Sequence, residues 1–160
     1  MKNRGATLIE ILIYTFLSIT LILILTDIFS TLLDKSQESV SYSEVEIDGK
    51  FINQKLFNQV GNANAISMPA NLNESGNNLS FSIDGENYSY YLSGSNLMLN
   101  DGVNIERLNG YGTEISDFSV TRLGNTGGKP MVKINYTVTS TILRPGGGEE
   151  RNIGLSVGTR

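Results

Sequence analysis

The chain has 160 residues, a formal net charge of −4 at neutral pH, and neither cysteine nor histidine. These absences exclude disulfide bonds, a thiol nucleophile, an imidazole base and a zinc site of the usual Cys/His type. A mildly acidic chain also lacks the strongly basic surface typical of nucleic-acid binding. The length favours one domain with a single hydrophobic core.

The first 33 residues carry the most distinctive pattern in the chain. Lys2 and Arg4 form a short basic leader that ends at Gly5, and the apolar run after it has no charged residue from 11 to 26. Residues 6–33 would form a helix about 42 Å long at roughly 1.5 Å per residue, which is enough to cross a bilayer. A secretory signal peptide has a shorter apolar core, with its small-residue cleavage site after that core, and does not fit.

Glu10 distinguishes between the remaining interpretations, because a carboxylate inside an apolar helix is unfavourable. A simple membrane anchor explains the length and the basic flank, which would stay cytoplasmic, but it gives no reason for this carboxylate. The stretch Gly5-Ala6-Thr7-Leu8-Ile9-Glu10, with its basic leader and long apolar continuation, resembles the processing signature of type IV prepilins. The residue that usually follows the glycine in that family is phenylalanine, whereas this chain has Ala6.

The resemblance implies a maturation pathway. A prepilin peptidase would cleave between Gly5 and Ala6, Ala6 would become the N-methylated amino terminus, and Glu10 would be the fifth residue of the mature chain. The implied partners are this peptidase, other pilin subunits and an inner-membrane assembly platform. The precursor would lie in the cell membrane, with residues 1–5 as a cytoplasmic leader and its head outside, before it enters an extracellular pilus or pseudopilus.

The implied role of Glu10 is contact between subunits in an assembled fibre. After cleavage, the positive amine of Ala6 in one subunit could meet the Glu10 carboxylate of a neighbour. At about 4 Å such a pair interacts more strongly in an apolar surround than in water, although desolvation offsets much of the gain. We therefore expect the pair to set the axial register of the subunits. Asp27, the second charge in this region, is expected to mark the outer boundary of the membrane-spanning segment.

Residues 34–63 are predicted to continue the same helix with one apolar face. That face is indicated by helical spacing of Ile52, Leu56, Val60 and Ala63. Gly49 is a weak point, because glycine in a helix costs up to about 1 kcal/mol relative to alanine. The glycine and asparagines from Gly61 onward supply a stop signal. The stretch 46–66 also resembles the corresponding region of J-type and W-type minor pilins.

From Leu79 onward the apolar residues alternate with a period of two, which predicts β-strands. Asp84-Gly85 and Asn100-Asp101-Gly102 are turn signals between them. Seven strands are predicted, at 79–83, 88–92, 97–99, 103–108, 115–122, 132–143 and 153–157. They are expected to form an antiparallel sheet in a head of residues 64–160, with one face on the helix and the other in water. The predicted fold is α+β and pilin-like, a long N-terminal helix packed on an antiparallel β-sheet head.

Three other features were weighed as possible sites. The glycine-rich stretch Gly124–Pro130 has no Walker pattern and is predicted to be a hairpin tip. Tyr88 and Tyr90 fall on one face of a strand and Tyr91 on the other, which favours cross-strand packing over a stacking platform for sugars or bases. The acidic residues of the head are scattered and lack the spacing of a calcium loop. The sequence therefore predicts no catalytic residue, no metal, no cofactor and no nucleic-acid partner.

Together these features predict a structural protein and not an enzyme. The expected function is that of a subunit of a type IV pilus-like fibre, a minor pilin that acts in assembly, in priming or at the tip. Two alternatives remain open at this point. One is a pseudopilin of a type II secretion or DNA-uptake system, and the other is an adhesive binding module carried at a fibre tip.

Overall fold

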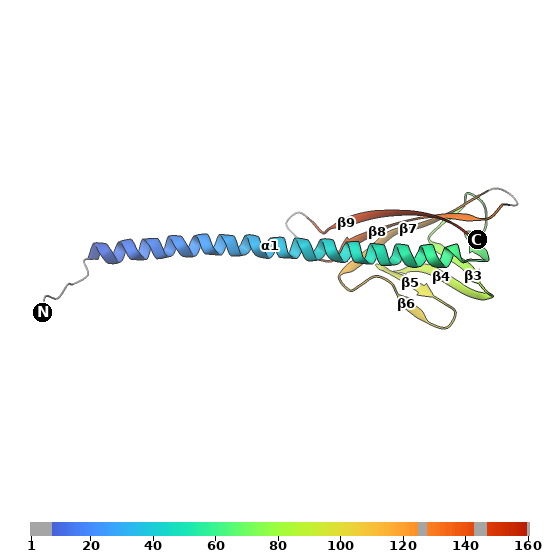
Figure 1. Ribbon diagram of the computed structural model, residues 1–160, viewed down its shortest axis with the longest axis horizontal. Coiled ribbons are helices and arrows are strands. Elements are labelled where there is room, and N and C mark those ends of the chain that lie inside the picture. Colours follow the sequence, from blue (N-terminus) through green and yellow to red (C-terminus); the bar gives the residue numbers. More distant parts are fainter. Residues whose placement is uncertain (1–7, 125–127, 143–146, 160) are drawn as a thin grey trace. The chain divides into compact units, whose positions relative to one another are not determined.

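The computed structural model describes residues 8–124, 128–142 and 147–159, and its chain divides into two compact units, Met1–Glu38 and Ser39–Arg160. A single helix, α1 (Leu8–Gly61), contributes to both units, and all strands belong to the second (Figure 1). The leader, Gly5 and Ala6 lie outside the described residues, as does Leu143. The helix predicted over 6–63 ends two residues beyond the observed end of α1.

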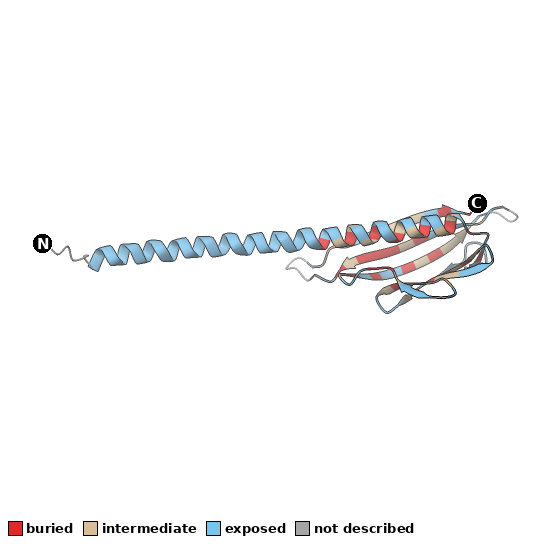
Figure 2. Ribbon diagram, turned by 60° about the horizontal axis from the view of Figure 1, so that its bottom comes forward, coloured by how far each residue is buried: buried red, intermediate tan, exposed pale blue. Residues whose placement is uncertain are grey.

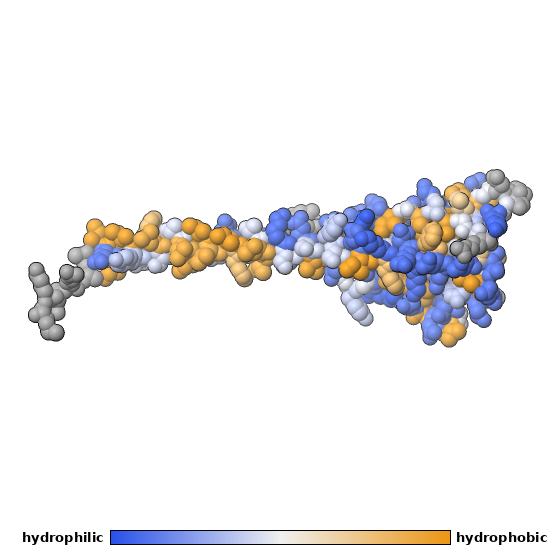
Figure 3. Space-filling view, in the orientation of Figure 1, coloured by the Kyte–Doolittle hydropathy of each residue, from blue (hydrophilic) through white to orange (hydrophobic). Residues whose placement is uncertain are grey.

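Within the first unit, every described residue of α1 is exposed. Figure 3 shows hydrophobic side chains over much of this part of the helix. Among the residues that the structure describes, α1 is the one helix long and apolar enough to cross a membrane. The bilayer is therefore an environment in which these exposed apolar side chains would be buried.

Within the second unit, α1 turns one narrow face to the sheets. Its buried residues follow helical spacing and are Ser41, Val45, Gly49, Ile52, Leu56 and Val60. Figure 2 shows these buried positions on the side of the helix that faces the strands. The predicted apolar face through Ile52, Leu56 and Val60 is confirmed, because all three side chains are fully buried. The last turn closes when Asn62 N donates to the Asn58 carbonyl at 3.3 Å.

Two antiparallel sheets form the rest of the second unit. The five-stranded sheet has the spatial order β1-β3-β4-β5-β6. Its strands are β1 (Ala65–Met68), β3 (Asn78–Ile83), β4 (Glu86–Ser93), β5 (Asn96–Asn100) and β6 (Ile105–Arg107). The four-stranded sheet has the order β2-β7-β8-β9. Its strands are β2 (Ser75–Gly76), β7 (Thr113–Leu123), β8 (Met131–Ser140) and β9 (Glu150–Gly158).

The α+β, pilin-like architecture predicted from the sequence is confirmed, but the head contains two sheets where one was expected. Both sheets contribute to one hydrophobic core together with α1, and Ile115 N of β7 donates to the Ser95 carbonyl beside β5 at 2.9 Å. The chain changes sheet from β1 to β2, returns from β2 to β3, and changes again between β6 and β7. The alternation of apolar residues identifies a strand but does not show which strands pair with it. The division of the strands into two sheets could therefore not be predicted from the sequence.

Two of the strands in the described residues were not predicted, and one was placed wrongly. β1 has a single buried residue, Ile66, and β2 has two residues, so neither offers enough alternation to recognise. The strand predicted at 103–108 is only β6, and its apolar residues Val103 and Ile105 are 85% and 60% exposed. Val103 lies in the turn before β6, and the buried leucine is Leu108, after the strand.

The predicted turn at Asp84-Gly85 is confirmed as a two-residue hairpin loop between β3 and β4. Both residues have positive φ, 51° and 92°, as a type I′ turn requires. This turn aligns Phe81 with Tyr88 and Leu79 with Tyr90. The side-chain rows of the five-stranded sheet follow from that register.

Gly49 has a packing role that propensity alone does not reveal. A Cβ atom at this position would lie 2.6 Å from Cδ1 of Ile153 in β9, closer than real contacts allow. The Gly49 carbonyl accepts a hydrogen bond of 3.1 Å from the buried hydroxyl of Tyr136 in β8. The glycine therefore lets the helix backbone approach the four-stranded sheet directly.

Candidate functional site

Glu10, the predicted assembly residue, lies in the first unit near the start of α1 and is exposed. The hydroxyl of Tyr14, one helical turn later, donates to Glu10 Oε1 at 3.3 Å. Tyr14 was not among the residues predicted from the sequence, although its i+4 spacing from Glu10 is the signal that would have found it. A carboxylate has room for further hydrogen bonds, so this contact leaves Glu10 able to accept another donor.

The other predicted site residues, Gly5 and Ala6, lie outside the described part of the chain. Cleavage after Gly5 and methylation of Ala6 therefore remain predictions from the sequence. The proposed pair between the Ala6 amine and Glu10 likewise remains a prediction.

Hydroxyl groups in the apolar part of α1 differ from Glu10 because the helix itself satisfies them. Four threonines donate to the carbonyl four residues earlier, at 2.8–3.0 Å, and they are Thr15, Thr20, Thr26 and Thr31. Such back-bonding removes the need for an external acceptor in an apolar environment. Glu10 is set apart chemically because its side chain carries a charge and its contact is with another side chain, the hydroxyl of Tyr14.

The second unit carries a set of exposed apolar residues on α1. Val40, Ile47 and Phe51 are 47%, 62% and 46% exposed, whereas Val45 and Leu56 of the same helix are buried. The spacings of seven and four residues put the three exposed side chains on one helical face, away from the buried stripe. We call these three residues the exposed apolar stripe.

Asp48 joins α1 to the loop between β6 and β7. Its Oδ2 accepts a hydrogen bond from Gly110 N at 2.7 Å and another from the hydroxyl of Thr113. In the same loop, the Arg107 guanidinium donates to the Gly110 carbonyl and lies 4.8 Å from the centre of the Tyr111 ring. This loop is therefore held in place although Tyr111 itself is 94% exposed.

The prediction that Tyr88 and Tyr90 pack across strands is confirmed. Both rings stack on Phe81, at centroid distances of 5.8 and 6.0 Å. The Tyr90 hydroxyl donates to Gln59 Oε1 of α1, and burial raises the pKa of this tyrosine above its usual range. These two rings therefore belong to the core side of the sheet and do not form an exposed stacking platform.

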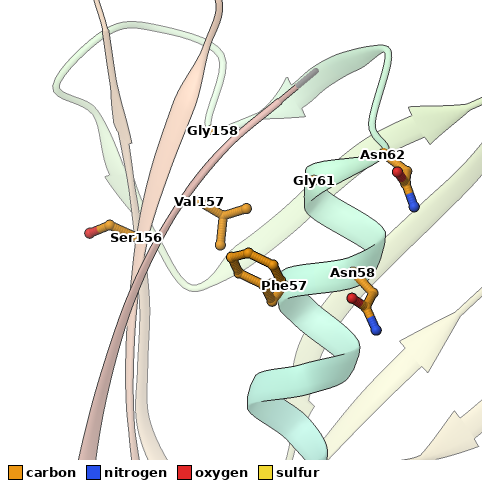
Figure 4. A pocket seen from close by; sticks show the side chains of 7 residues that line it. All are labelled: Phe57, Asn58, Gly61, Asn62, Ser156, Val157 and Gly158. Atoms are coloured by element: carbon orange, nitrogen blue, oxygen red, sulfur yellow. The ribbon is translucent and has the colours of Figure 1, made fainter.

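Two clefts of similar size open on the second unit. One of about 340 Å³ lies between the end of α1 and β9, where the side chains of Phe57 and Val157 lie close together, whereas those of Asn58 and Asn62 project from the other side of α1 (Figure 4). Its lining has no titratable side chain, so it offers no acid, base or charged nucleophile. The other, of about 350 Å³, lies on the five-stranded sheet and is lined mainly by hydroxyl and amide side chains.

A metal site is not formed by the residues that the structure describes, because no three or more Asp or Glu residues come together in a group that could hold an ion. Acidic residues of the second unit instead form ion pairs at its surface. Glu46, for example, pairs with Lys50 at 2.7 Å and with Arg151 at 2.8 Å. Hydrogen bonding to Lys50 is the main cause that lowers the pKa of Glu46.

Comparison with known proteins adds no relative from which a site could be transferred. Neither a family model, nor a curated protein, nor a solved structure matches the chain.

Proposed function

We propose that this chain is a minor structural subunit of a type IV pilus-like fibre. The observation that carries the proposal is the stretch from Lys2 to Glu10, a basic leader, a glycine and a glutamate at the fifth position after it, followed by a long apolar helix. The helix-and-sheet architecture is compatible with a pilin-like fold and supports the proposal.

The proposed pathway has two stages. The precursor is held in the cell membrane by residues 6–33, with its head outside, until a prepilin peptidase cleaves after Gly5. The mature helix then leaves the lipid for a bundle of like helices, where other subunits replace lipid around its apolar side chains. The exposed apolar stripe supports this stage, because Val40, Ile47 and Phe51 remain about half exposed.

Cleavage is tested with Gly5→Val. A side chain at this position should obstruct the close approach of a peptidase to the backbone, so the variant should keep its leader. The measurement is the intact mass of protein extracted from membranes of cells that make pili. A wild-type chain that still begins at Met1 in such cells would refute the proposal.

Glu10 is tested by its effect on assembly. Because its proposed partner is the amine of a neighbouring subunit, Glu10→Ala should be processed normally and remain stable in the membrane, yet enter fibres poorly. Glu10→Asp keeps the charge with a shorter reach and should be partly defective. The measured quantity is the ratio of mutant protein in sheared fibres to that in membranes.

Tyr14→Phe is the matched control for Glu10, since it removes only the 3.3 Å contact and keeps the carboxylate. We expect it to assemble nearly as well as the wild type. Equal incorporation of Glu10→Ala and wild type would remove the pairing hypothesis. That result would favour a position at the extreme tip, where no further subunit supplies the amine.

A further inference from the structure

We propose that the outward face of the five-stranded sheet binds a neutral oligosaccharide. We call this surface the outer face, and the strand register defines it as the side opposite the core residues Leu79, Phe81 and Tyr90. Its side chains on the three central strands are Asn78, Ser80, Ser82, Asn87, Ser89, Tyr91, Ser93, Asn96, Met98 and Asn100. The inference does not rest on the fibre proposal, because it concerns the head alone.

The first observation is that the outer face of these strands carries no charge. The whole chain has 16 acidic residues. The acidic residues on the strands of this sheet are Glu86 and Glu106, and their pairing with Ile83 and Leu99 places them on the side of the sheet opposite the outer face. Glu106 there pairs with Lys55 of α1 at 2.5 Å. Ordinary solvated surfaces mix both signs of charge, so a whole face of hydroxyls and amides is unusual for this acidic chain.

The second observation is that many of these polar groups are available to a ligand. The side chains of Ser80, Ser82, Asn87 and Ser89 make no hydrogen bond to any residue that the structure describes. Asn100 uses its Oδ1 to accept from Gly102 N at 2.8 Å, which leaves its side-chain NH₂ group without a partner among the described residues. The face thus presents donors and acceptors together, the combination that sugar hydroxyls require.

The third observation is a cleft in this face. Ser80, Ser89, Asn87 and Asn100 line it, and its volume of about 350 Å³ falls within the range of roughly 300–1,000 Å³ typical of ligand sites. Gly102 closes one side, where its turn comes close to the Asn87 carbonyl. An aromatic side chain of the outer face is nearby, because Tyr91 follows Ser89 on the same face of its strand and pairs with Asn78 on one side and Met98 on the other.

Charge decides between neutral and acidic ligands. The cation that borders the face is Arg107, whose guanidinium already donates to the Gly110 and Thr113 carbonyls and stacks on Tyr111. Its Nη2 is thus engaged within its own loop, and its Nε is buried without a hydrogen-bond partner among the described residues, so neither is offered to a ligand. The net charge of the chain is −4, which repels anions. An acidic glycan or a nucleic acid therefore fits this surface poorly. A protein partner is also disfavoured, because interface centres are rich in aromatic and apolar residues.

The test uses the full chain in a zwitterionic detergent that has no sugar head group, so that the detergent cannot compete. The chain is screened against an array of neutral, sialylated and sulfated oligosaccharides, and the best ligand is titrated calorimetrically. We expect binding confined to neutral oligosaccharides. Removing both central hydroxyls, in Ser80→Ala/Ser89→Ala, should weaken Kd about tenfold or more, the equivalent of one or two hydrogen bonds.

A second variant and a control keep the result interpretable. Asn87→Asp has nearly the same shape but adds a carboxylate in the cleft, and it should weaken binding even if the double variant proves unstable. Ser156→Ala alters the other cleft, beside α1 and β9, and should bind as the wild type does. The proposal is overturned if no neutral oligosaccharide binds, if acidic ones are preferred, or if folded outer-face variants bind unchanged.

Discussion

At the scale of single residues, side-chain hydrogen bonds tie α1 to both sheets. Asp48 accepts from the loop between the two sheets, Tyr90 reaches α1 from the five-stranded sheet, and Tyr136 does so from the four-stranded sheet. None of these links connects residues close in sequence. Each contributes about 0.5–1.5 kcal/mol in typical proteins, and more is lost when one partner is left buried and unpaired.

The two buried tyrosines predict a loss of stability at alkaline pH. Burial raises the pKa of Tyr136 and of Tyr90 in the folded protein, so the unfolded chain releases these protons first, near pH 10. The stabilisation is complete below that pH and falls by up to about 1.4 kcal/mol per pH unit for each tyrosine above it.

Tyr136→Phe should therefore flatten the alkaline limb of a plot of stability against pH, although it lowers stability at neutral pH by removing one hydrogen bond. The measurement is urea unfolding of a fragment that begins at Lys35, at pH values from 8 to about 11.5. Tyr111→Phe, at an exposed position, is the control. Parallel curves for Tyr136→Phe and wild type would contradict the assignment.

At the scale of elements, the contact between α1 and β9 depends on Gly49. By helix propensity this glycine is a local weakness of the helix, whereas in the folded protein its missing side chain makes room for Ile153. Close packing against the four-stranded sheet thus offsets the loss in helix propensity. The same close approach lets the Gly49 carbonyl accept a hydrogen bond from Tyr136.

Gly49→Leu should lower the free energy of unfolding by about 1–3 kcal/mol or more, because the side chain must displace Ile153 from the interface. Gly61→Leu is the matched control in the same helix, since nothing lies within 4 Å of a Cβ atom at that position. It should leave stability nearly unchanged. Urea unfolding of both variants in the fragment from Lys35 gives the comparison. Unchanged or raised stability of Gly49→Leu, as for Gly61→Leu, would show that helix propensity, not the contact with β9, governs Gly49.

At the scale of the whole molecule, the two units have different requirements for burial. The described residues of the first unit are all exposed, so their apolar side chains are buried only in an environment that this chain does not itself provide, such as a bilayer. The second unit contains every residue of the hydrophobic core, from Val45 to Val157. Its stability should therefore not depend on the first unit.

A fragment that begins at Lys35 is accordingly expected to be soluble and monomeric. It should show mixed helix and sheet signals in far-ultraviolet circular dichroism and should melt cooperatively. Leu56→Ala, which removes a fully buried side chain, should destabilise it by about 2–5 kcal/mol. Phe57→Ala, at an exposed neighbour, should have a much smaller effect. A fragment that aggregates or melts without cooperativity would mean that the core needs the first unit.

The candidate assembly site shows how far the sequence alone could go. The apolar run identifies a candidate membrane-spanning segment, and the unusual charge within it singles out Glu10 without any structure. The contact between Tyr14 and Glu10 could have been predicted from the sequence, because residues four apart share a helix face. The outer face could not have been predicted, since its serines and asparagines come from three strands whose register only the folded sheet sets.

The sequence by itself determined the long helix, its apolar first part, its buried face from Ile52 to Val60, and most of the strands. Those features follow from periodicity, which each segment carries locally in its own order of apolar and polar residues. Only the tertiary structure decided that the strands form two sheets, that Gly49 is a contact point, and that Val103 and Ile105 are exposed. These outcomes depend on which distant segments meet, and alternation along one strand does not encode its neighbours.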